Sequence, residues 1–344
     1  MTTILAAIFV FGLLIIGHEF GHFTVAKLSG IKVLEFSFGM GPRILKFKKG
    51  DTEYSLRIFP IGGFVRMLGE DEQVDDPRSF SCKPVLARMA TVAAGPIMNV
   101  IISILIFAGI AMAVGYAKPV VKSYPDKPKS NPNIVYPVES AGIRPGDKIV
   151  EANGRSVLTY EDFKLFMYQN GGKTFDMTVK RGNQKITKSI TPIYISEYNM
   201  YMVGIDPVFE KASLFEGLQY GTFNTWSLTK QMFSALGGLI TGATSTNDLS
   251  GPVGIIRYTG EVAKQGFANL LVFTSLLSIN LALMNLIPFP ALDGGWVLLL
   301  LIEGIRGKKL DPNKVGMLNF VGFAFLILLT VFVTFKDVMK LNIF

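Results

Sequence analysis

Two histidines stand four positions apart near the end of the first apolar stretch, as His18 and His22, and Glu19 lies between them. Positions four apart share one face of an α-helix, so both imidazoles can reach a single metal ion. Glu19 lies on the adjoining side, where its carboxylate can reach a water held by that ion. The spacing therefore predicts a metal centre that activates water for hydrolysis, with Glu19 as the general base.

The same His-Glu-x-x-His pattern also occurs by chance in soluble proteins, so its surroundings decide what it means. Here it follows an apolar run that starts at Ile4 and contains no earlier charge. An ionisable side chain at the centre of a bilayer costs about 2.5 to 3.5 kcal/mol on the insertion scale. Three such residues together favour a functional site over coincidence.

The composition is that of an integral membrane protein, because 49% of the residues are hydrophobic and only 17% are charged. The net charge of +8 comes from lysines and arginines spread through loops, which favours contact with anionic membrane lipids and argues against nucleic acid. The single cysteine, Cys82, excludes an internal disulfide. The first residues lack the basic start of a cleaved signal peptide, so we expect the first apolar segment to be retained.

Four apolar stretches are long enough to cross a bilayer, which takes about 20 residues. The predicted spans cover residues 4–28, 89–116, 270–288 and 315–335. Pro288 and Pro290 interrupt the third span, which continues as a second apolar piece over 296–302. Basic residues follow the first span and fill the loop before the fourth, so we expect these ends to be cytoplasmic and both termini to be extracytoplasmic.

Between the first two spans, β-forming residues alternate with Gly and Pro, which predicts short strands and turns at the cytoplasmic membrane interface. One interpretation is a strand edge, including Gly62, Gly63 and Phe64, that binds an extended substrate through its main chain. The alternative is a plain cytoplasmic hairpin, and the sequence leaves both open. In the second span, Gly95, Pro96 and Asn99 are expected to form a surface opposite the histidines, with Asn99 as a structural hydrogen-bonding residue.

After the second span the composition becomes that of a soluble α+β module, with a helix over 160–169 and strands near 174–181 and 184–191. Its stretches AGIRPGD (141–147) and IVEANG (149–154) resemble bacterial PDZ domains, which bind extended peptides by adding a strand. A peptide-binding module and a spacer that excludes bulky substrates both fit this pattern.

A catalytic zinc usually has three protein ligands, so the two histidines need a partner, and a carboxylate is the best candidate. Asp293 follows the double-proline break and is flanked by apolar sequence on both sides. An Asp-Gly pair ordinarily indicates a turn. An ionisable residue in a turn within the membrane is costly, which favours a functional role for it. We therefore predict that Asp293 completes a Zn²⁺ site with His18 and His22.

Four motifs together resemble the site-2 protease family, in the subgroup of the regulator of sigma-E protease with a single PDZ domain. They are HEFGH (18–22), AGPIMN (94–99), SGPVGI (250–255) and NLIPFPALDGG (285–295). The resemblance implies a zinc metalloendopeptidase that cuts single-span membrane proteins inside the membrane, such as anti-sigma factors or signal-peptide remnants. It also implies substrate contacts at Asn285 and Pro288 and a membrane-reentrant β-loop over about 36–67. The best-studied Gram-negative members carry two PDZ domains, whereas this insert has room for one.

The predicted fold is a multi-span α-helical membrane protein with four transmembrane helices, a cytoplasmic-side membrane-associated β-hairpin region and an inserted extracytoplasmic PDZ-like domain. The predicted segments are 1–30, the β-loop region 31–86, 87–117, the PDZ-like domain 118–208, an amphipathic helix and linker 209–266, the broken span 267–304 and 305–344. The expected partners are single-span substrates and lipids of a bacterial cell membrane. A metal transporter and an inactive peptide-binding scaffold are the competing classes, but no inverted repeat appears and the metal motif is intact.

Overall fold

A computed structural model describes residues 2–70, 72, 74–129, 132–240 and 251–340. Residues 241–250 of the predicted linker, including Ser250 of the SGPVGI stretch, lie outside the described residues. The chain divides into two compact units. The helical unit comprises Met1–Ser103 and Thr229–Phe344, and the inserted unit comprises Ile104–Leu228.

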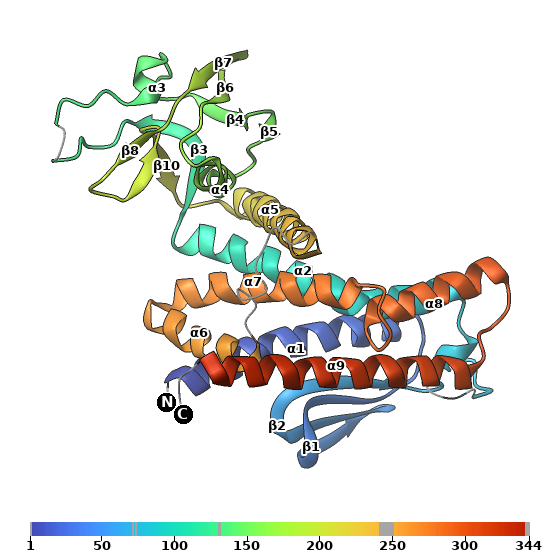
Figure 1. Ribbon diagram of the computed structural model, residues 1–344. Coiled ribbons are helices and arrows are strands. Elements are labelled where there is room, and N and C mark those ends of the chain that lie inside the picture. The colour runs from blue at the N-terminus through green and yellow to red at the C-terminus, as the bar shows by residue number, and fades with distance from the viewer. Residues whose placement is uncertain (1, 71, 73, 130–131, 241–250, 341–344) are drawn as a thin grey trace. The chain divides into compact units, whose positions relative to one another are not determined.

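Among the described residues, four helices are long and apolar enough to span a membrane, and they correspond to the four predicted spans. The helices that lie wholly or partly in the helical unit are α1 (Thr2–Leu28), α2 (Val85–Ala113), α5 (Leu214–Ile240), α6 (Pro252–Lys264), α7 (Phe267–Leu286), α8 (Asp293–Arg306) and α9 (Pro312–Lys340), with a short 3₁₀ helix η1 (Phe80–Cys82) (Figure 1). The boundary between the units falls within α2 and α5.

The prolines of the third apolar stretch separate α7 from α8. Helix α7 ends at Leu286, before Pro288 and Pro290, because proline cannot donate the next helical hydrogen bond. The chain then folds back sharply, so that a Cβ on Gly294 or Gly295 would collide with backbone oxygens of the connecting segment. This turn leaves Asp293 as the first residue of α8.

Strands β1 (Val33–Lys49) and β2 (Thr52–Met67) pair with one another through a bent and irregular register. Ser37 lies opposite both Phe64 and Ser55, because the strands fold back and place 35–38 between 63–66 and 53–56. Glycines with positive φ, Gly39, Gly41 and Gly62, lie at the bends. The sheet thus consists of two long, bent strands of 17 and 16 residues, whereas the sequence predicted short strands and turns.

The core of the helical unit joins these strands to the helices. Its buried cluster contains Ala26, Ile31, Val33, Val65, Met67, Phe80, Val92 and Leu300. Because Val65 and Met67 belong to this cluster, the last stretch of β2 is fixed against α1, α2 and α8. A second cluster packs Ala6, Val10 and Leu14 of α1 against Leu270 of α7.

The inserted unit is an α+β module, as the sequence predicts. Its elements are β3 (Tyr116–Ser123), α3 (Pro137–Ser140), β4 (Lys148–Ala152), β5 (Arg155–Ser156), α4 (Tyr160–Asn170), β6 (Phe175–Arg181), β7 (Gln184–Ile190), β8 (Ile193–Ile195), β9 (Met200–Met202) and β10 (Asp206–Glu210). The main sheet has the order β10-β3-β4-β6-β7, with β5 on β4. Helix α4 starts at a capping box of Thr159 and Asp162 and ends at the left-handed Gly171.

Candidate metal centre

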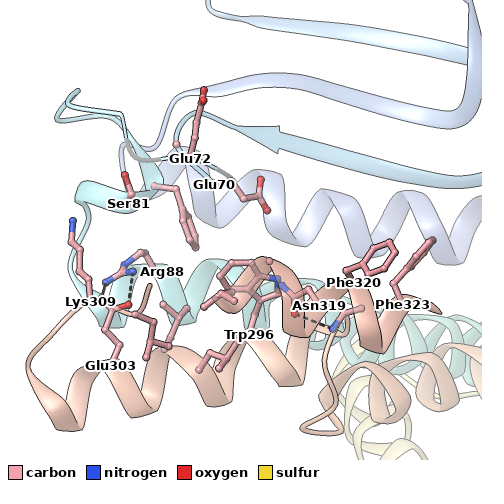
Figure 2. Close-up of a pocket in the computed structure, with 18 residues that line it drawn as sticks. Glu70, Glu72, Ser81, Arg88, Trp296, Glu303, Lys309, Asn319, Phe320 and Phe323 are labelled. Atoms are coloured by element: carbon pink, nitrogen blue, oxygen red, sulfur yellow. Dashed lines mark hydrogen bonds and ion pairs between the residues drawn. The ribbon is translucent and has the colours of Figure 1, made fainter. Parts of the chain in front are cut away.

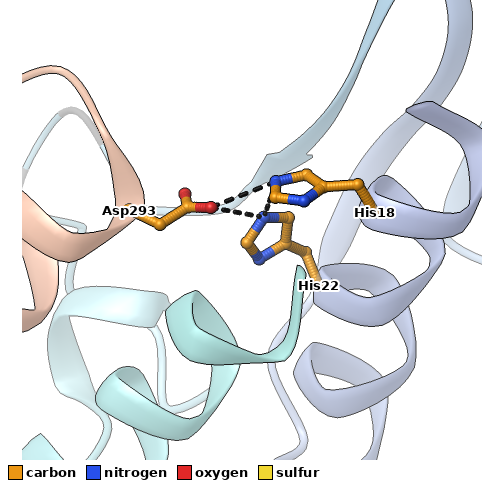
Figure 3. Close-up of side chains that lie close together, drawn as sticks. All are labelled: His18, His22 and Asp293. Carbon is orange, nitrogen blue, oxygen red and sulfur yellow. Dashed lines mark hydrogen bonds and ion pairs between the residues drawn. The ribbon is translucent and has the colours of Figure 1, made fainter. Parts of the chain in front are cut away.

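Two imidazoles of α1 and the carboxylate that begins α8 converge on one point (Figure 3). The Nε2 atoms of His18 and His22 are 3.1 Å apart. Oδ2 of Asp293 lies 3.0 Å from Nε2 of His18 and 3.6 Å from Nε2 of His22. Tetrahedral zinc with bonds of about 2.0 to 2.1 Å separates its ligand atoms by about 3.3 Å. The three donor atoms therefore have the spacing that a zinc ion requires.

The burial of these donors supports the same assignment. Both histidines are buried, and Oδ2 of Asp293 is a buried atom that no described residue satisfies with a hydrogen bond of good geometry. A buried, unsatisfied carboxylate oxygen is costly unless a cation is bound to it. Two imidazoles and one carboxylate are a donor set of catalytic zinc sites, so the residues present fit this ion.

A hydrogen bond to the backbone of α2 orients the imidazole of His22. Its Nδ1 lies 2.9 Å from the backbone carbonyl of Thr91, to which it donates. With the proton on Nδ1, the lone pair of Nε2 is free to bind a metal. Helix α2 can approach this closely because residue 95 is glycine, where a Cβ would collide with the ring of His22 and lie 2.8 Å from Cε1 of His18.

Asn99 has the corresponding role beside His18. It is fully buried, its amide lies 3.2 Å from Nδ1 of His18, and its backbone carbonyl accepts a hydrogen bond of 2.8 Å from Ser278. Its Oδ1 has no partner among the described residues. A half-turn of the amide places Oδ1 against Nδ1–H of His18, which satisfies this oxygen and frees Nε2 for a metal.

Comparison with known proteins identifies the family. The chain matches Peptidase family M50 over residues 6–329. It belongs to this family, the site-2 proteases. A putative zinc metalloprotease of Clostridium acetobutylicum is 43% identical over 97% of each chain. The regulator of sigma-W protease RasP of Bacillus subtilis is 32% identical over 99% of each chain.

The chain is therefore a zinc metalloendopeptidase of a bacterial membrane, with Zn²⁺ as its cofactor and intramembrane proteolysis as its general activity. A solved PDZ domain of an SdrC-like protein from Listeria monocytogenes matches 28% of this chain and 92% of that one, at 22% identity and a TM-score of 0.22. At that TM-score the likeness decides nothing about the inserted unit, whose PDZ-like interpretation continues to depend on its sequence motifs.

The three candidate metal donors line a cavity of about 250 Å³. Glu19 is half-buried in its wall, next to the histidines, and Phe64 of β2 lines it as well. Gly63 brings the strand against Glu19, since a Cβ there would lie 3.1 Å from Cγ of Glu19. A carboxylate, the candidate metal donors and a strand are thus arranged around one cavity.

The predicted substrate-binding residues are placed unequally around this cavity. Asn285 lies near the metal donors, with Nδ2 3.5 Å from Nε2 of His18. Phe64 lines the cavity, and the ring is covered by the guanidinium of Arg57 at 5.0 Å. Gly62 contacts Met40 within the β-sheet instead, and Pro288 lies in the turn after α7.

A second cavity, which the sequence analysis did not predict, is drawn in Figure 2 and shares lining residues with the first. Its volume is about 510 Å³, and Glu70, Phe80, Ala291 and Trp296 line both cavities. Arg88 and Glu303 also line it and form a buried ion pair of 2.5 Å. Each of these two charged residues lies at the end of an apolar segment, which was the available signal in the sequence. Because Arg88 and Glu303 are 215 positions apart, that signal could not show that they pair with one another.

Proposed function

We propose that the protease hydrolyses peptide bonds within or near the transmembrane segments of single-span membrane proteins. In this proposal His18, His22 and Asp293 hold the zinc ion. Glu19 is the general base that takes a proton from the attacking water. The observation that supports it most strongly is the convergence of three metal donors, one of them an unsatisfied buried carboxylate, between apolar helices.

A zinc ion held by these three residues would supply Lewis acidity, which would polarise the scissile carbonyl and lower the pKa of a water molecule to about 7. Glu19 accepts the proton of the attacking water and then donates it to the leaving amine. Its position on the cavity wall, beside both histidines, is suited to these two transfers. Phe80 and Trp296 line the same cavity and supply apolar surface beside the reacting carbonyl.

A transmembrane substrate must unwind locally, because a helix keeps its carbonyls in internal hydrogen bonds. We infer that the unwound segment pairs with the last stretch of β2, at Gly62, Gly63 and Phe64. In support, residues 63–66 pair with β1 on one side, and no described strand pairs with their other side. Asn285 and Pro288 are proposed to contact the same segment from the end of α7.

Both termini and the inserted unit are proposed to be extracytoplasmic, with the metal centre nearer the cytoplasmic side. The basic residues Lys27 and Lys32 after α1, and those between α8 and α9, support this orientation. The relative from Bacillus subtilis is named a regulator of sigma-W protease, which favours membrane-bound anti-sigma factors as substrates here. Leftover signal peptides are the other proposed substrates.

The test is the Glu19→Gln variant, purified in detergent and incubated with a model single-span substrate. We expect zinc content to stay at the wild-type level and cleavage to fall by about 10²- to 10⁴-fold, because general acid–base catalysis is lost. Mass spectrometry of the products should place the wild-type cut within or near the apolar segment. Glu261→Gln, an exposed change on α6, is the matched control. An active Glu19→Gln enzyme would refute the assignment.

A further inference from the structure

Helix α9 is mostly exposed, since only 6% of the residues in its most apolar part are buried. One of its faces nevertheless contacts the turn that precedes Asp293. Asn319, Gly322 and Phe325 follow one another at intervals of three and so share a face. Gly322 packs on Pro290, where a Cβ would lie 2.6 Å from the proline side chain. The ring of Phe325 lies 5.6 Å from that of Phe289.

Asn319 makes the polar contact of this face. Its Oδ1 accepts a hydrogen bond of 3.2 Å from the backbone N–H of Ala291, and its side chain lies at the edge of the larger cavity (Figure 2). Pro288 and Pro290 have no backbone N–H to offer. The N–H groups of Phe289 and Leu292 donate to carbonyls of the turn itself, so α9 holds the turn through the N–H of Ala291.

Ala291 has the backbone conformation that most needs such a restraint. Its φ is +71°, in the left-handed region that residues with a Cβ rarely adopt. It is two residues before Asp293, and Leu292 between them is the N-cap of α8 without a side-chain cap. A change in the conformation of Ala291 would redirect the first turn of α8 and move the carboxylate away from the imidazoles.

We propose that Asn319 is a positioning residue for the zinc site: its Oδ1 holds Ala291 in the left-handed conformation that directs Asp293 toward His18 and His22. The inference depends on the proposed function, since it needs Asp293 to be a zinc ligand. It also assigns a local task to the first half of α9, whereas Asp337 near the other end of this helix accepts hydrogen bonds from Gly251 and Gly254. A purely structural Asn319 would stabilise packing of α9 without affecting zinc affinity selectively.

The experiment measures zinc affinity of the full-length protein in detergent, by competition with a chromophoric chelator. We expect Asn319→Ala to weaken affinity about 10-fold, the lower end of losses seen when groups that orient metal ligands are removed. Ala291→Gly should restore most of this loss in the double variant, because glycine adopts the left-handed conformation without the hydrogen bond. Asn313→Ala, the other asparagine of α9 and an exposed one, is the matched control and should keep wild-type affinity.

Two results overturn the inference: wild-type zinc affinity in Asn319→Ala, or a weakened affinity that Ala291→Gly does not restore. The second result would show that the substitution acts through general destabilisation. Asp293→Ala, measured in the same assay, distinguishes failure of the proposed function. If Asp293→Ala keeps wild-type affinity, the ligand set itself is wrong; if it loses zinc while Asn319→Ala does not, only the positioning role fails.

Discussion

Two clusters of buried ionisable groups in the helical unit differ in how their carboxylates are satisfied. Glu35 of β1 is 2% exposed and accepts hydrogen bonds from Ser55 at 2.8 Å, from Arg57 at 2.7 Å and from Arg43 at 3.2 Å. Oδ2 of Asp293 lies beside two imidazoles but has no hydrogen-bond donor of good geometry among the described residues. The carboxylate of Glu35 thus has its hydrogen-bond donors within the protein, whereas Oδ2 of Asp293 lacks one in the part of the chain that the structure describes.

This difference separates a structural cluster from a functional one without reference to any motif. Arginines are always protonated, so the carboxylate of Glu35 has its cationic partners within the protein. Imidazoles with Nδ1 engaged present lone pairs, which repel a carboxylate unless a cation lies between them. Buried polar groups that lack partners therefore indicate where a metal belongs, and satisfied ones indicate where the fold is held together.

The largest effect should come from Asp293→Asn, which keeps the shape but removes the charge that binds the cation. We expect zinc affinity to fall by more than about 100-fold, since losing a ligand exceeds the loss of a group that only orients one. Cleavage should fall with it. Chelator competition in detergent checks the first effect, and Asp311→Asn, at an exposed position, should change neither. Unchanged zinc affinity in Asp293→Asn would show that Asp293 does not bind the cation, and the functional interpretation of its cluster would then be wrong.

The converse change is Glu35→Gln, which should reduce stability and leave zinc affinity intact. Removing one partner of a buried ion pair costs about 3 to 5 kcal/mol, but Arg43 and Arg66 are partly solvated, so we expect about 2 kcal/mol. Thermal unfolding in detergent measures this. Glu53→Gln, which affects a more exposed pair with Arg43, should cost less than about 1 kcal/mol. A fall in zinc affinity in Glu35→Gln would contradict this expectation and show that the two clusters depend on one another.

The parts of the metal centre that sequence could predict are those with a short-range signal. The spacing of His18 and His22 and the break before Asp293 both follow from local rules of helices and prolines. The four apolar spans follow from hydropathy alone. Bringing Asp293 to the histidines is a tertiary event, which the sequence predicts only because a third ligand is chemically required.

The groups that orient those ligands gave no comparable signal. The contact of Asn99 with His18 and that of Asn319 with Ala291 each join residues far apart in the chain. Asn99 could be predicted to form some hydrogen bond, but its partner depends on how α2 crosses α1. The left-handed conformation of Ala291 is likewise hidden, because alanine does not ordinarily mark such a turn.

A smaller effect is expected for Asn99→Leu, which removes the group beside His18 but keeps a side chain of similar size. Without an acceptor for Nδ1–H, the imidazole can place its proton on Nε2, which then cannot bind zinc. We expect zinc affinity to fall about 10-fold. The control is Asn269→Leu, an exposed change on α7. If Asn99→Leu instead lowers only the melting temperature, Asn99 belongs with the structural cluster.

The smallest effect concerns pH and the Glu35 cluster. Burial alone would raise the pKa of Glu35, but hydrogen bonds from Arg57 and Ser55 and the charges of Arg57 and Arg43 hold this pKa below its ordinary value. Because the folded pKa is the lower one, the stability from this carboxylate is fully present above the unfolded value of about 4.3 and is lost as pH falls through the folded pKa. The melting temperatures of the wild type and Glu35→Gln should therefore differ by a constant amount from pH 7 to 5 and converge below pH 4. A constant difference down to pH 3 would show that the charge of Glu35 contributes nothing, and the cluster would then be held by packing alone.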